Sequence, residues 1–202
     1  ENMEFLTLLK EKNADCNVRV NTNLSTTDTG IFEILRELPN VHWTVSVETI
    51  EEEYNYIRHH GDWQDFSSNI NLIRKLDHKI TFNMLHFILN YRSLFGCVDY
   101  LKGIGFHDNS FVIGPMHSPK ELHLLNLPGP IVDSVIKTLK ERIDLGPAGY
   151  LKNSYDNLLK YFSSTPWRKD INNFIAETEA RDKRRGTDCR KVFPKLFEEL
   201  NA

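Results

Sequence analysis

The feature that most constrains the fold of this chain is a change of hydrophobic period that repeats along its first 127 residues. Apolar residues alternate at the two-residue spacing of a strand in segments 17–23, 41–48, 79–87 and 110–113. Helical spacing occupies segments 5–12, 31–38, 51–60, 62–76 and 92–102. Consecutive strands joined by helices of this length form right-handed crossovers, so the pattern predicts an α/β fold with parallel strands.

The strand signal stops after the Pro-Gly-Pro sequence at 128–130. Four later segments, 132–143, 149–162, 168–181 and 191–200, all have the spacing of helices. We therefore expect two parts: a β/α domain over residues 1–127 and a helical C-terminal extension over 128–202.

One face of the predicted strands is polar. In segment 41–48 the apolar residues Val41, Trp43, Val45 and Val47 alternate with His42, Thr44, Ser46 and Glu48. A parallel strand covered by helices on both sides is normally apolar throughout. Polar faces on three successive strands favour a partial barrel with a polar interior and helices outside. An edge strand with one wet face is the alternative.

In such barrels the functional groups lie at the carboxyl ends of the strands and in the loops that follow. This rule selects the strand-end residues Asn23, Ser25, Ser46, Glu48, His86, Asn90 and 114–117. Glu48 is the sharpest candidate, because a carboxylate can accept two hydrogen bonds from a vicinal diol. The alternative is a solvated acid near the acidic run 51–53.

Charge and composition exclude several classes of partner. The formal net charge is −3, with 25 Lys and Arg against 28 Asp and Glu, which disfavours nucleic acid as a ligand. The apolar runs are far shorter than the roughly 20 residues that span a bilayer. Cys16, Cys97 and Cys189 are widely spaced and form no metal or disulfide pattern. We expect a cytoplasmic protein without a signal peptide, and an N-terminus that is a cut rather than a natural start.

Several short motifs, taken in order, resemble the later strands of radical S-adenosylmethionine (radical SAM) enzymes. They are Asn-Thr-Asn at 21–23, Val-Ser-Val-Glu at 45–48, Arg58 before Gly-Asp-Trp at 61–63, Asn83, Asn90, and Gly-Phe at 105–106 before SFVIG. With RRGTD and VFPKL near the end, the chain resembles over nearly its whole length the twitch-domain-containing radical SAM proteins of phage and marine metagenomic sequences.

The resemblance implies a partial (β/α)6 barrel, similar to a TIM barrel, with S-adenosylmethionine across the strand ends. Asn23 would fill the asparagine of a TNG-like motif, in which Leu24 replaces the glycine. The other implied contacts are Ser46 with the methionyl carboxylate or ribose, Glu48 with the ribose hydroxyls, Arg58 with the carboxylate, and Asn83 or Asn90 with the adenosyl end. Arg58 pairing with Glu51 or Asp62, and Asn83 bonding to neighbouring backbone, are the structural alternatives.

The implied reaction is reductive cleavage of S-adenosylmethionine to a 5'-deoxyadenosyl radical, which takes hydrogen from an unknown substrate, a peptide or a small molecule. That chemistry needs a 4Fe-4S cluster held by a CxxxCxxC motif. The motif is absent here, so the resemblance implies the C-terminal part of a longer enzyme, with no metal ligands and little catalysis of its own.

Three alternatives remain open at this stage. The chain could be a non-catalytic, degenerate SAM-binding or interaction module. It could be a metal-dependent barrel hydrolase that uses Glu48, His86 and His117, although no HxH or HExxH spacing supports this. The basic run 181–185 could contact an acidic partner or form a solvated helix end.

Overall fold

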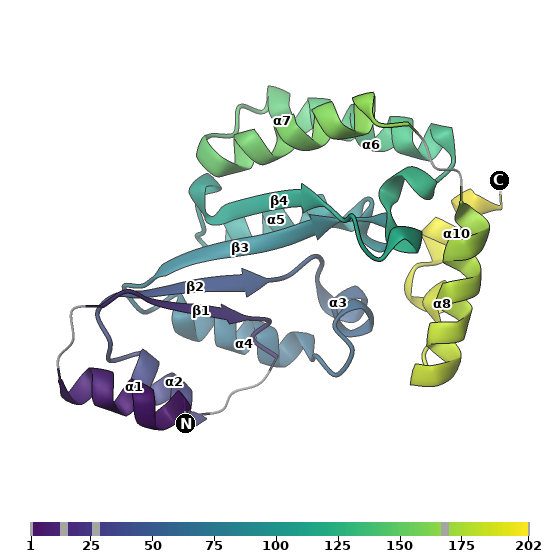
Figure 1. The fold of residues 1–202 in the computed structure, drawn as a ribbon. Coiled ribbons are helices and arrows are strands. Elements are labelled where there is room, and N and C mark those ends of the chain that lie inside the picture. Colours follow the sequence, from purple (N-terminus) through teal and green to yellow (C-terminus); the bar gives the residue numbers. More distant parts are fainter. Residues whose placement is uncertain (1, 13–15, 26–28, 167–169, 202) are drawn as a thin grey trace.

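A four-stranded, all-parallel sheet forms the centre of the molecule (Figure 1). The computed structural model describes residues 2–12, 16–25, 29–166 and 170–201. The strands are β1 (Val18–Thr22), β2 (Val41–Ser46), β3 (Lys79–His86) and β4 (Phe111–Pro115), and they lie in the order of the chain. The predicted α/β class and parallel sheet are therefore confirmed.

Helices precede, connect and follow the strands. The helices of the first part are α1 (Asn2–Glu11), α2 (Thr29–Leu35), α3 (Glu51–Ile57), α4 (Trp63–Ile73) and α5 (Ser93–Gly103). Those that follow β4 are α6 (Gly129–Asp144), α7 (Gly149–Ser164), α8 (Ile171–Arg185), α9 (Cys189–Val192) and α10 (Pro194–Leu200). Short 3-10 turns η1 (Ile88–Asn90), η2 (Asp108–Ser110), η3 (Lys120–Leu122) and η4 (Leu124–Asn126) occupy the loops around β4 and after β3.

Most predicted segments match these elements closely, with one instructive exception. The segment 191–200 is not one helix but two, α9 and α10, which meet at Phe193. Pro194 opens α10 because a proline has no N–H to continue the preceding helix and fits the first helical turn. The carboxylate of Asp188 caps α9 by accepting from the N–H groups of Arg190 and Lys191.

The sheet has two different faces. One face carries large apolar side chains that pack against the connecting segments: Trp43 contacts Phe32 of α2, and Phe82 contacts Phe106 in the loop after α5. Right-handed crossovers between strands in chain order place connecting helices on this face, and Figure 1 shows α4 and α5 behind the sheet, whereas α3 lies beyond the carboxyl ends of the strands. We call the opposite side the open face; its residues Asn21, Thr44, Thr81 and Asn83 are half-buried or exposed.

The helices after residue 128 cover two edges of the sheet. α6 and α7 lie along β4 (Figure 1), and the hydroxyl of Ser154 in α7 accepts a 2.9 Å hydrogen bond from the backbone N–H of Ile113. α8 and α10 lie at the end of the sheet toward which the strands point. The apolar core continues from the strands into these helices, through residues such as Leu158 and Phe174.

Candidate functional site

A hollow of about 320 Å³ lies at the carboxyl ends of the strands, on the side of the open face. We call it the strand-end pocket. Its walls come from the segment after β2, the end of α3, the ends of β3 and β4, and α8. The apolar lining is Tyr56, Ile57, Leu85, Phe87, Leu89, Met116, Pro119 and Leu122, and the charged lining is Glu48, Arg58, Arg181 and Arg185.

Glu48 and Arg58 form a two-pronged ion pair in this pocket. The Nε of Arg58 donates to Oε2 of Glu48 at 2.8 Å, and Nη2 donates to Oε1. The side chain of Glu48 is 4% exposed and that of Arg58 is 25% exposed. Burial raises the pKa of the Glu48 carboxyl, and the adjacent guanidinium acts in the opposite direction. The alternatives of a solvated Glu48, and of Arg58 paired with Glu51 or Asp62, are therefore wrong.

The loop that holds Arg58 needs a glycine at position 61. Arg58 ends α3, with its N–H bonded to the carbonyl of Tyr54 at 2.8 Å, and the chain then turns sharply so that the Gly61 N–H reaches the Arg58 carbonyl. A Cβ at position 61 would lie 2.7 Å from that carbonyl oxygen. Gly61, which marks the break between two predicted helices, thus also allows the tight turn that follows Arg58.

Ser46 and Asn83 are brought together by the sheet. They are register partners on β2 and β3, both on the open face, with Ser46 half-buried and Asn83 exposed. Neither side chain makes a hydrogen bond to another described residue, so the alternative that Asn83 serves neighbouring backbone is wrong in the described part of the chain. Both polar groups are free to bind a ligand on the open face.

Asn23 and Asn90 have different surroundings. Asn23 is exposed just beyond β1, and its side-chain oxygen accepts hydrogen bonds from the backbone N–H and hydroxyl of Ser25 at 3.2 and 2.8 Å. Asn90 is fully buried; its amide donates to the carbonyls of Glu48 and Leu85, at 3.0 and 2.8 Å, and accepts from the N–H of Phe87. In this conformation Asn90 holds the loop after β3 against the end of β2 and does not line the pocket.

The histidines predicted for a metal site do not gather around Glu48. His86 is fully buried on the helix-covered face, between Phe95 and Phe162, and its Nε2 lies 3.1 Å from the carbonyl of Tyr91. Burial lowers the pKa of His86 to about 4, so it is a neutral core residue. His117 instead packs on the ring of Tyr161. The hydrolase ligand set is therefore not assembled.

The described residues contain no group of three His, Cys, Asp or Glu side chains that could hold a metal ion. Cys16 precedes β1, Cys97 lies in α5 and Cys189 begins α9, so the cysteines belong to three separate elements. Burial raises the pKa of the Cys189 thiol to about 12 and also raises that of Cys97, which keeps both in the protonated form.

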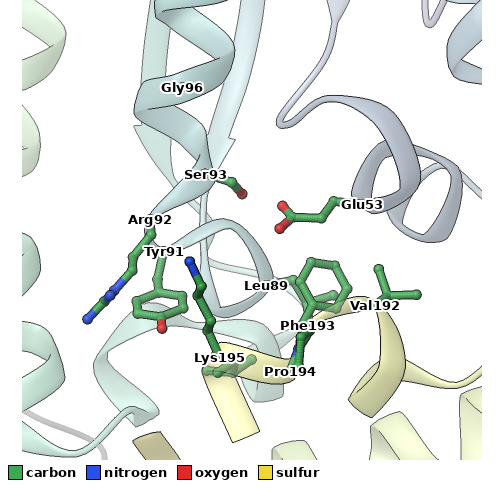
Figure 2. Close-up of a pocket in the computed structure, with 11 residues that line it drawn as sticks. Glu53, Leu89, Tyr91, Arg92, Ser93, Gly96, Val192, Phe193, Pro194 and Lys195 are labelled. Carbon is green, nitrogen blue, oxygen red and sulfur yellow. The ribbon is translucent and has the colours of Figure 1, made fainter. Parts of the chain in front are cut away.

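A second hollow, of about 420 Å³, lies among α3, α5 and α10. Figure 2 shows the Glu53 carboxylate and the Ser93 hydroxyl turned toward each other, with Lys195 reaching in from the α10 side. The Thr49 hydroxyl donates to Glu53 Oε2 at 2.7 Å. This hollow contains neither Glu48 nor Arg58, which both line the strand-end pocket, so we take the strand-end pocket as the candidate site.

Two of the residues selected from the sequence, Glu48 and Arg58, line this pocket. Ser46 and Asn83, which were also selected, lie on the open face and are not among the lining residues. Arg181 and Arg185 of α8 also line the pocket. Their four-residue spacing, which places both on one side of a helix, was the available signal within the basic run.

Comparison of the chain with protein-family models, with curated proteins and with solved structures found no match in any of the three. Among the helices that the structure describes, none combines the length and the apolar character needed to cross a membrane.

Proposed function

We propose that this chain binds S-adenosylmethionine in the strand-end pocket and forms the later-strand portion of a radical SAM enzyme, which takes hydrogen from an unidentified substrate. One observation carries the proposal. The pocket lies at the carboxyl ends of parallel strands taken in chain order, on a polar face, and is built around a buried Glu48–Arg58 pair.

The strand order supports a sector of a β/α barrel. Doubly wound sheets reverse their strand order and place helices on both faces. Here the order β1-β2-β3-β4 follows the chain, α2, α4 and α5 share one face, and the polar residues share the other. A partial (β/α)6 barrel has this arrangement, with the open face as its interior.

The backbone at Leu24 gives independent support for the family. This residue replaces the glycine of the TNG-like motif, and its φ of 54° lies in the left-handed region that favours glycine. The conformation is held because Leu24 is 1% exposed and its carbonyl accepts a 2.8 Å hydrogen bond from Asn69. A left-handed residue at this position is compatible with the glycine that the TNG-like motif has there.

The residues present fit S-adenosylmethionine in part. Glu48 and two of the three guanidinium nitrogens of Arg58 are engaged with each other, which leaves Arg58 Nη1 for the methionyl carboxylate. Ser46 and Asn83 offer a free hydroxyl and amide on the adjoining strands. Glu48 orients Arg58 in this arrangement, and both carboxylate oxygens that a ribose diol would contact already accept from Arg58.

The residues present do not fit a 4Fe-4S cluster. Three thiolates must converge on such a cluster, and Cys16, Cys97 and Cys189 lie on separate elements. We therefore assign no electron-transfer step to this chain. Its own contribution is to bind and orient the cofactor.

The separation of the cysteines also favours a second candidate, a non-catalytic module that binds S-adenosylmethionine or a related nucleoside without cleaving it. Both candidates need the same binding site. They differ in whether a cluster-bearing partner segment completes the protein.

The test is calorimetric titration of the 202-residue chain with S-adenosylmethionine and S-adenosylhomocysteine. We expect binding that a paired Ser46→Ala, Asn83→Ala variant weakens by about thirtyfold, since each of the two lost hydrogen bonds to a ligand costs about 1 kcal/mol. Arg19→Ala is the matched control, because Arg19 is exposed on the same open face at its opposite end. Absence of binding, or equal weakening by the control, would refute the proposed site.

A further inference from the structure

The basic run at the end of α8 divides into two groups. Arg181 and Arg185 line the strand-end pocket and are half-buried, whereas Lys183 and Arg184 are exposed. Residues four apart lie on the same side of a helix, so the run has one inward and one outward side. A solvated helix end does not account for the inward pair.

Asp182 fixes this helix end against the rest of the molecule. Its carboxylate accepts hydrogen bonds from the Tyr56 hydroxyl of α3 at 2.9 Å, the Thr187 hydroxyl at 2.7 Å and the Cys189 N–H at 2.7 Å. Gly186, in the left-handed conformation, ends α8 directly after Arg185. These hydrogen bonds attach the end of α8 to α3 and to the start of α9. They thereby fix the position of Arg181 and Arg185 at the pocket.

The lining of the pocket carries three guanidinium groups and one carboxylate, that of Glu48. Arg58 is neutralised by Glu48, and Arg181 has Glu121 at 4.0 Å. Arg185 forms no ion pair within the described ranges. Burial, with Arg181 and Arg184 nearby, lowers the pKa of Arg185, while Tyr56 and Asp182 act in the opposite direction. An anion beside Arg185 would add charge-assisted hydrogen bonds that no described side chain supplies.

We propose that Arg181 and Arg185 form a binding site for the carboxylate or phosphate group of a second small molecule, whose apolar part contacts Leu85 and Met116 on the pocket wall. Guanidinium groups bind carboxylate and phosphate oxygens through paired, charge-assisted hydrogen bonds. The anion site stands on the geometry of α8. We take this second molecule to be the substrate, and that step rests on the proposed function.

The test uses two probes, inorganic phosphate and glutarate, titrated calorimetrically into the full chain at constant ionic strength. We expect at least one to bind, and the one that binds more tightly identifies the chemical class. The variant Arg181→Gln, Arg185→Gln should weaken binding by about tenfold or more, since a hydrogen bond to a charged group contributes substantially. The matched control Lys183→Gln, Arg184→Gln removes the same charge from the outward side and should stay within about twofold.

Two results would overturn the anion site: no binding of either probe, or equal weakening by the inward and outward variants. If the double variant does not fold, Arg185→Gln alone provides the same comparison, because Arg185 has no ion pair to lose in the described structure.

Titration of the same variants with S-adenosylmethionine separates this inference from the proposed function. Unchanged cofactor binding in the inward variant, together with lost probe binding, supports a second ligand. Equal loss of both would assign the arginines to the cofactor and overturn the inference. Probe binding without any cofactor binding would refute the proposed function and leave the anion site standing.

Discussion

The two faces of the sheet differ in burial and in polarity. On the helix-covered face, Trp43, Phe82 and Phe111 are at most 1% exposed and join a continuous apolar core. On the open face, polar residues stand in rows without comparable burial until the strands end at Glu48 and Arg58. The difference shows that the apolar core lies on one face, and the proposed function assigns a ligand to the other.

The largest expected effect comes from the covered face. Phe82→Ala should lower the free energy of unfolding by about 3–5 kcal/mol, because it removes a fully buried ring that packs on Phe106 and Phe111. Urea denaturation measures this change. A loss below about 1 kcal/mol would contradict the central position given to this face.

The Glu48–Arg58 ion pair is buried, so its loss should destabilise the protein about as much as a change in the core. Arg58→Ala should cost about 3 kcal/mol at pH 7.5, because it leaves the buried Glu48 carboxylate without a partner. Lowering the pH should reduce the cost, since the neutral form of Glu48, whose pKa burial already raises, needs no partner. The control is Arg36→Ala, which removes an exposed pair with Glu33 and should change stability by less than about 1 kcal/mol.

The covered face should also respond to acid through His86. The unfolded chain binds a proton on this residue below pH 6.5, whereas the folded chain resists until about pH 4. The unfolded state therefore holds more protons in this window, and stability should fall by up to about 3 kcal/mol as the pH drops across it. Denaturation of the wild type and His86→Leu at several pH values measures the difference.

In His86→Leu the loss of stability between pH 6.5 and 4 should be smaller than in the wild type by about that amount. His117→Asn, at an exposed position near the end of β4, is the control and should retain the wild-type slope. Identical slopes in all three proteins would show that His86 does not remain neutral in the core.

The smallest effect on stability is expected on the open face. Asn83→Ala should change the free energy of unfolding by less than about 0.5 kcal/mol, because its exposed side chain has no hydrogen-bond partner among the described residues. The same variant should weaken ligand binding. A large loss of stability would mean that the polar row serves the fold and not a ligand.

The predictions from sequence were most accurate where the signal was local. Alternation at 41–48 gave β2 and its two faces, and the break at Gly61 gave the boundary between α3 and α4. The single helix predicted at 191–200 is wrong, because Pro194 starts a new helix there. The apolar spacing runs through this residue and does not show the break. Glu48 was selected correctly as a strand-end residue, but its burial and its partner were not foreseen.

The sequence by itself determined the β/α alternation, the polar side of the strands and the candidate residues at their ends. These features are local, because side chains repeat every two residues along a strand and every 3.6 residues along a helix. Only the tertiary structure decided that Arg58 faces Glu48, that Asn90 holds backbone, and that Arg181 and Arg185 reach a pocket formed by β3 and β4. Those contacts depend on how helices pack and which charges lose water, and a linear pattern of residues does not specify either.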